Sequence, residues 1–115
     1  AKLLALAQQR LQAYANNLHL GNVWDWVPPQ RFDYVRAELD YVPSNYRQPL
    51  IQRLLAEFVA PNGQLIIAQY RSRRDDLTDG WVDRELDKYG FQVFERHSGY
   101  SGEGLELCRV AVLRP

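Results

Sequence analysis

The stretch Arg31-Phe-Asp-Tyr-Val-Arg-Ala-Glu-Leu-Asp-Tyr-Val-Pro43 decides the fold, because it predicts a strand that runs into a polar loop. An amphipathic helix follows, and then Ala60-Pro-Asn-Gly-Gln-Leu-Ile-Ile-Ala68 predicts a turn and a second apolar strand. Strand, helix, turn and strand make a right-handed parallel crossover. We therefore expect an α/β fold whose ligands bind where the first strand ends, among its acidic and aromatic residues.

The segments on either side of this crossover predict further helices and strands. Apolar residues at helical spacing predict an amphipathic helix over 1–18, and a short strand is expected over 18–20. Residues 44–49 are expected to lead into the crossover helix, with Pro49 in its first turn. A third helix is expected over 79–89, capped at its start by Asp76, Thr78 or Asp79 and ended by Gly90.

The C-terminal region predicts a hairpin of two strands, over 91–96 and 105–113. Three glycines between residues 98 and 104 are typical of the loop of a hairpin.

Composition limits the classes of function. The chain has 115 residues, which fits one domain over 1–115. Its 14 basic and 14 acidic residues cancel, and this balance argues against nucleic-acid binding. No apolar run approaches the roughly 18 residues that span a bilayer. The single cysteine excludes an internal disulfide, and we expect a cytoplasmic location. The chain has no methionine and begins with Ala1, so we expect it to start inside a longer reading frame.

The order of these elements resembles that of class I S-adenosylmethionine-dependent methyltransferases. The resemblance rests on an acidic strand end, a helix, a Pro-Asn-Gly turn into an apolar strand, a helix closed by Tyr89-Gly-Phe91, and a terminal hairpin. It covers essentially the whole chain and implies a Rossmann-like methyltransferase half-fold, with parallel strands, a terminal antiparallel hairpin and helices on the faces. Residues 18–20, 32–39 and 64–69 would be the third, fourth and fifth strands of the family.

The resemblance also implies a strand order. The strand at 32–39 would lie beside 64–69, followed by the central strand at 105–113 and then the outer strand at 91–96. The glycine-rich cofactor loop and the first two strands of the family have no counterpart here. The resemblance therefore implies the C-terminal part of such an enzyme, truncated at its N-terminus.

The segment Asn22-Val-Trp-Asp-Trp26 follows the expected third strand. By resemblance, Asp25 would accept the amino group of adenine, the next backbone N–H, that of Trp26, would meet a ring nitrogen, and Trp24 or Val23 would form a wall. The alternative is a loop aspartate that caps a turn beside two packing tryptophans. A charged hydrogen bond is worth roughly 1.5–3 kcal/mol, so we expect this chain to bind S-adenosylmethionine weakly or not at all.

Arg36 and Glu38 alternate with apolar residues near the end of the first strand. They either form the floor of a cofactor and substrate cleft, or pair with each other, or lie on a sheet face left open by the missing half of the fold, because unpaired charge is costly to bury. No catalytic base is predicted, since methyl transfer depends mainly on the alignment of nucleophile and methyl group.

The remaining reactive residues predict no site. His19 and His97 have no companion at metal-ligand spacing, so no metal is predicted, and Cys108 is expected in the core. The carboxylates of Asp75 and Asp76 are expected in a solvated loop. The same loop holds a small basic cluster, Arg71, Arg73 and Arg74.

Two hypotheses about function follow. The chain is either the C-terminal fragment of a methyltransferase acting on an unidentified small molecule, inactive alone, or a stand-alone non-catalytic module that acts through oligomerisation or partner binding. Without a first strand, the edge of 32–39 and the apolar stripe of the first helix would be open, so we expect a homodimer. The alternative is that residues 18–20 fold back and cover this edge within one chain.

Overall fold

A mixed sheet of four strands forms the centre of the computed structural model, which describes residues 1–72, 74–76 and 78–115. The strands are β1 (Phe32–Ala37), β2 (Val59–Tyr70), β3 (Glu95–Tyr100) and β4 (Glu106–Leu113), in the order β1-β2-β4-β3. β1 and β2 are parallel, whereas β4 is antiparallel to both of its neighbours. The predicted α/β class and the predicted order, with the last strand inside the sheet, are confirmed.

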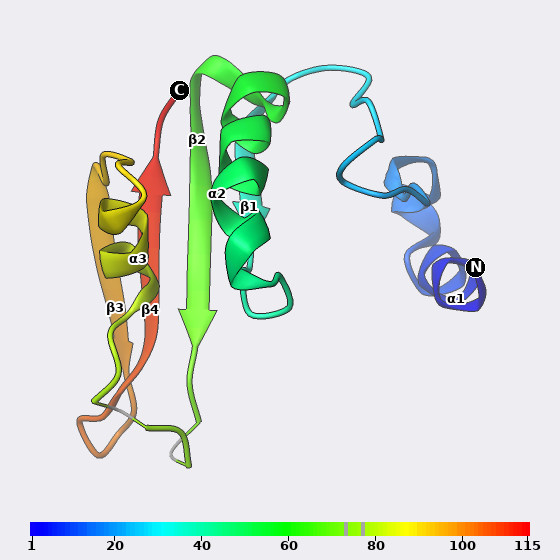
Figure 1. Cartoon of the computed structure of the whole chain (residues 1–115). Helices are drawn as coiled ribbons and strands as arrows, with labels where there is room; N and C mark the ends of the chain where they lie inside the picture. The colour runs from blue at the N-terminus through cyan, green and yellow to red at the C-terminus, as the bar shows by residue number, and fades with distance from the viewer. Residues whose placement is uncertain (73, 77) are drawn as a thin grey trace.

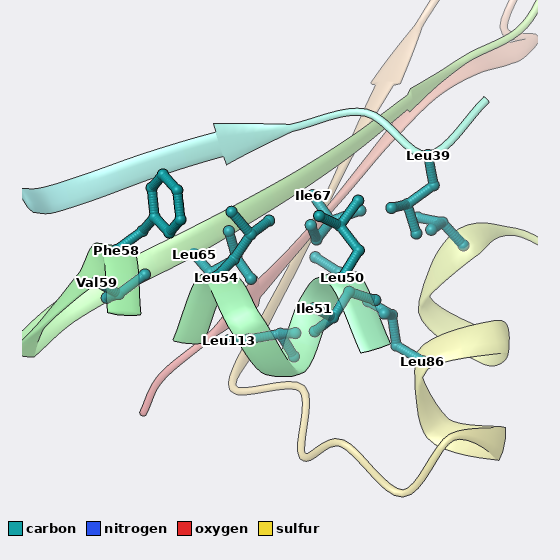
Figure 2. Packing of buried hydrophobic residues seen from close by; sticks show 12 residues of the cluster. Leu39, Leu50, Ile51, Leu54, Phe58, Val59, Leu65, Ile67, Leu86 and Leu113 are labelled. Atoms are coloured by element: carbon teal, nitrogen blue, oxygen red, sulfur yellow. The ribbon is translucent and has the colours of Figure 1, made fainter. Parts of the chain in front are cut away.

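The helices α2 (Ser44–Arg53) and α3 (Val82–Lys88) lie on the same face of this sheet (Figure 1). Their apolar side chains meet those of β2 and β4 in one core, in which Ile51, Leu65, Ile67 and Leu86 are fully buried (Figure 2). Burying each such side chain contributes about 2 kcal/mol. This packing fixes the carboxyl ends of β1 and β2 relative to the helices.

The junction between α2 and β2 differs from the predicted turn. The helix continues through a π-helical segment, η2 (Leu54–Phe58), and β2 begins directly afterwards at Val59. Phe32 pairs with Val59 but Tyr34 pairs with Gln64, so the Pro-Asn-Gly sequence forms an irregularity inside the strand. A Cβ on Gly63 would lie 2.8 Å from the carbonyl oxygen of Asp33, which explains why a glycine is needed where β1 passes.

The expectation that Pro49 lies in the first turn of α2 is wrong. The helix begins at Ser44, so Pro49 lies in its second turn. Proline has no N–H to donate to the carbonyl of Asn45, and one helical hydrogen bond is lost there. Burial of Leu50 and Ile51, directly after the proline, offsets this loss.

The N-terminal segment departs most from prediction. The expected helix over 1–18 is split into α1 (Lys2–Arg10) and a 3-10 helix, η1 (Gln12–Asn17), by Leu11 with φ −116° and ψ 53°. The expected strand over 18–20 does not form, because no described strand lies beside these residues and an isolated strand has no partners for its backbone groups. Both helices lack buried residues, and α1 lies apart from the sheet (Figure 1).

The C-terminal hairpin is shifted toward the C-terminus. Gly90 ends α3 with φ +89°, as predicted, but the strand expected over 91–96 begins only at Glu95. Phe91 and Val93 instead pack against the core, which holds the chain away from β4 until Phe94 donates its amide to Val112 at 2.9 Å. Among the described helices, none has the length and apolar character that a membrane crossing requires.

Candidate functional site

The loop at 22–26 is organised by Asn22. The carbonyl oxygen of Asn22 accepts the amides of Asp25 and Trp26 at 3.1 and 2.7 Å, and its Oδ1 accepts the amide of Trp24 at 3.0 Å. Asparagine favours such turns because its side chain can bond the backbone two residues on. Sequence reasoning missed this role of Asn22, although a Gly-Asn pair such as Gly21-Asn22 is typical of a turn.

Arg53, in the last turn of α2, joins this loop to the body of the protein. Its Nε donates to the carbonyl of Val23 and its Nη2 to the carbonyl of Trp26, both at 2.7 Å. The guanidinium also pairs with Glu57 and lies 5.4 Å from the centre of the Phe58 ring. Sequence reasoning missed Arg53, because nothing near it in the sequence indicates partners about 30 residues away.

The two tryptophans of the loop have different environments. Trp26 is half-buried and its ring packs against His19 and Phe58, with centroid separations of 5.6 and 5.9 Å. Trp24 is exposed and meets Tyr46 edge-on at 6.0 Å. Trp26 thus has the packing role of the alternative interpretation, whereas Trp24 remains available for an aromatic ligand.

The hydrogen-bond donors of the loop bear on the predicted adenine contact. The amide of Trp26, which the resemblance assigned to a ring nitrogen, already donates to Asn22. Within the described residues, the amide of Val23 makes no hydrogen bond, and the exposed carboxylate of Asp25 accepts none. The carboxylate of Asp25 can therefore accept a hydrogen bond from a ligand, whereas Val23 lines a different cavity from Asp25. Whether Trp24, Asp25 and Trp26 hold a cofactor stays a prediction.

A cavity of about 440 Å³ lies between this loop and the end of the α2–η2 helix. Trp24 and Asp25 line one side, and Arg53 and Glu57 line the other. The volume is within the usual range of small-molecule sites, which hold ligands with a few polar groups beside apolar walls. The chemistry of the lining fits adenine, because a carboxylate can accept its amino group and an indole can cover its ring.

Arg36 and Glu38 lie at the carboxyl end of β1. Arg36 Nη2 is 2.6 Å from Glu38 Oε1 and donates to Tyr70 Oη at 3.1 Å. These hydrogen bonds, the one to Tyr70 first, raise the pKa of Arg36. The two residues therefore form the ion pair of the alternative interpretation. In the pairing of β1 with β2, Arg36 lies opposite Ile66. The neighbouring residue Val35 packs against the core on the helix side of the sheet. Successive side chains of a strand alternate between the two faces, so Arg36 points to the face that α2 and α3 leave uncovered.

A second, polar cavity of about 510 Å³ lies at the carboxyl end of β2. Asp40, Tyr70 and Arg71 line it, together with the ion pair in which Arg47 Nη1 contacts both carboxylate oxygens of Glu85 at 2.9 Å. Asp75, Asp76 and Asp79 add further carboxylates, so acidic residues exceed basic ones in this lining.

Arg71, directly after β2, makes contacts that hold the loop between β2 and α3 in place. Arg71 donates to the carbonyls of Asp79 and Gly80 and lies over the Trp81 ring at 3.9 Å. The guanidinium of Arg71 is therefore occupied by contacts within the protein. Arg74 is exposed. Arg73, the third member of the predicted basic cluster, lies outside the described residues.

No family model matches the sequence, and no curated protein matches it. Solved structures do match. The glycopeptide N-methyltransferase MtfA in complex with S-adenosyl-L-methionine superposes with a TM-score of 0.70 at 15% identity, over 100% of this chain and 69% of MtfA. A S-adenosylmethionine-dependent methyltransferase from Leishmania major gives 0.64 at 14% identity, over 97% of this chain and 51% of that one. The chain has a methyltransferase fold.

A further structure extends the similarity to another methyltransferase. The N-methyltransferase NodS from Bradyrhizobium japonicum has a TM-score of 0.59 at 16% identity, over 94% of this chain and 67% of NodS. The present chain thus spans about half to two thirds of the length of these methyltransferases. At such low identity, the similarity establishes the fold.

Proposed function

We propose that this chain is the C-terminal part of an S-adenosylmethionine-dependent methyltransferase and is inactive alone. The observation that carries this proposal is the similarity of essentially the whole chain to methyltransferase structures, over only part of their lengths. The strand order supports it, because a central antiparallel β4 sets this sheet apart from simple parallel doubly wound sheets.

In this proposal, loop 22–26 provides the adenine side of a cofactor site. Asp25 would accept the amino group, Trp24 would cover the ring, and Trp26 would support the loop from below. Arg36 and Glu38 pair with each other at the carboxyl end of β1, whereas the cavity of loop 22–26 lies beside its start, so the proposal leaves these two residues out of the adenine side of the site. When bound, S-adenosylmethionine supplies a methyl group on a positively charged sulfur, and the protein contributes alignment of the acceptor.

The affinity expected for the isolated chain is low. One charged hydrogen bond and a stacked ring contribute a few kcal/mol, whereas micromolar binding needs about 8 kcal/mol. The sequence has no glycine-rich loop for the remainder of the cofactor. We expect weak binding or none, a cytoplasmic location, and a small-molecule acceptor chosen by segments outside this chain.

The test is a fluorescence titration that uses Trp24 and Trp26 as probes. Cofactor should cause no saturable quenching at micromolar concentration, and weak quenching at millimolar concentration should be lost in Asp25→Ala but kept in Asp33→Ala, a matched change on the exposed surface of β1. Saturable micromolar quenching that Asp25→Ala abolishes would show a working site and contradict the inactive fragment. Equal responses of the two variants would remove Asp25 from the site.

A second candidate function is a non-catalytic module that acts by assembly. Leu3 and Leu6 are exposed on α1, at 83 and 49% of their surface, and Leu11, between α1 and η1, is exposed at 48%. β1 also has a neighbour on one side only, within the described sheet. Such surfaces favour association with another chain.

A further inference from the structure

The guanidinium of Arg53 supplies both side-chain hydrogen bonds that join loop 22–26 to the rest of the described structure. These two hydrogen bonds end on the carbonyls of Val23 and Trp26, so they hold the loop near both of its ends. The side chain of Arg53 is only 17% exposed, and Glu57 balances its charge from one helical turn away. A partly buried, charge-balanced arginine has a well-defined geometry, because its planar fork fixes the directions of its donors.

We propose that Arg53 is a positioning residue that holds loop 22–26 in the shape of an adenine-binding site. This inference rests on the proposed function. The loop also makes aromatic contacts, Trp26 with Phe58 and Trp24 with Tyr46. Those contacts place the rings, and the hydrogen bonds to Asn22 hold the turn together from within. The two bonds from Arg53 fix the carbonyls of Val23 and Trp26, and with them the peptide planes at the two ends of the loop.

The consequence for binding is preorganisation. Asp25 must present its carboxylate, and Trp24 its ring, in a fixed relation to bind adenine in the cavity that both residues line. The carbonyl of Val23 points to Arg53. If this part of the loop were disordered, ordering it would add to the free-energy cost of binding. A loop that Arg53 already holds in place avoids that cost. Arg53 also lines the cavity beside Asp25 and Trp24, so its removal would change the shape of the site directly.

The experiment compares Arg53→Lys with two controls on the same helical segment. Lysine keeps the charge and the aliphatic stem but cannot donate in the two fixed directions that the guanidinium provides. Glu57→Gln removes the ion pair and keeps both donors to the loop. Gln52→Ala is a neutral change at the exposed neighbouring position of α2. Amide hydrogen exchange and the indole NMR signal of Trp24 are followed in each variant, with adenosine at millimolar concentration as the probe.

The amide of Trp26 should exchange at least about tenfold faster in Arg53→Lys, while Ile67 in the central strand keeps its rate. Both controls should keep the slow exchange of Trp26. Adenosine should shift the indole signal of Trp24 in the unmodified chain and in Gln52→Ala, and the shift should be lost or reduced at least about tenfold in affinity in Arg53→Lys.

Each result decides a different point. Unchanged exchange at Trp26, or exchange that rises equally at Ile67, would overturn the clamp, since the effect would then be absent or global. An adenosine shift retained at full affinity in Arg53→Lys would overturn the positioning role. Loss of loop order in Arg53→Lys, combined with no adenosine shift in the unmodified chain, would refute the proposed cofactor site while showing that Arg53 does hold the loop.

Discussion

Gln69 Oε1, at the end of β2, accepts the backbone amide of Val82 at 2.8 Å and so satisfies a donor at the start of α3. The predicted caps were Asp76, Thr78 or Asp79, and this prediction is wrong. Asp76 Oδ1 instead accepts the amide and the hydroxyl of Thr78, at 2.9 and 2.6 Å. The first turn of α3 is therefore held to β2, one of the two inner strands of the sheet.

Replacement of Gln69 by alanine should lower the free energy of unfolding by about 1 kcal/mol, the usual effect of losing a helix cap. Gln69→Glu keeps an acceptor oxygen beside the positive end of the helix and should be close to the unmodified chain in stability. Urea denaturation followed by circular dichroism measures both. Equal losses in the two variants would show that the acceptor role is not what matters at this position.

Asp83 is the one buried charged residue of the described structure, and it lies between Arg96 and Arg109. Burial raises its pKa, but hydrogen bonds from the two arginines outweigh that effect and hold the pKa below its usual value. Since the folded pKa is below the unfolded value of about 3.9, this carboxylate stabilises the fold above that pH and the contribution is lost as the pH falls through the folded pKa.

The change Asp83→Asn should therefore cost about 2 kcal/mol at neutral pH and reduce the acid dependence of stability. Asp87→Asn, on the same helix, removes a more exposed partner of Arg96 and should cost less than about 1 kcal/mol. Thermal unfolding between pH 2 and 7 provides the comparison. Parallel pH profiles for Asp83→Asn and the unmodified chain would contradict this assignment.

Gly63 lies against the backbone of β1, at the irregularity in the pairing of β1 with β2. An added methyl group would lie 2.8 Å from the Asp33 oxygen and 3.0 Å from Val59 Cγ1, so Gly63→Ala should destabilise the fold by about 1–3 kcal/mol. Gly102→Ala is the matched control, because nothing lies within 4 Å of a Cβ there. Denaturation midpoints of the two variants should differ clearly, and similar midpoints would argue against a close approach of the strands.

We propose that the isolated chain forms a homodimer through the open edge of β1, the first helices, or both. Light scattering at micromolar concentration should then give about twice the chain mass of 13.4 kDa. The double change Leu3→Ser and Leu6→Ser should weaken a dimer held by α1, whereas Leu20→Ser, an exposed leucine outside the helices, should not. A monomer at all concentrations, with protected amides in β1, would rule this assembly out.

The crossover from β1 to β2 could be predicted from sequence because it depends on local patterns, as the uniformly apolar run 65–68 shows. Whether residues 18–20 form a strand could not be predicted from such a local pattern. A strand of three residues depends on a neighbour, and the sequence pattern carries no information on whether that neighbour is present. Trp24 and Asp25 line a cavity, and their role in binding stays a prediction. The bond of Arg53 to backbone carbonyls could not be predicted, because it depends on tertiary geometry alone.

The position of β4 inside the sheet has a consequence for the order in which the chain folds. β3 is synthesised before β4, yet within the described sheet β4 is the neighbour that β3 pairs with. β2 likewise has only β1 beside it until residues 106–113 have left the ribosome. The hairpin of β3 and β4 can form locally, but it must then insert its edge against β2 over a large separation in sequence. During translation, the edge of β2 that β4 later covers therefore stays unpaired while residues 71–113 are made, and this is the stage at which a chaperone would have most to protect.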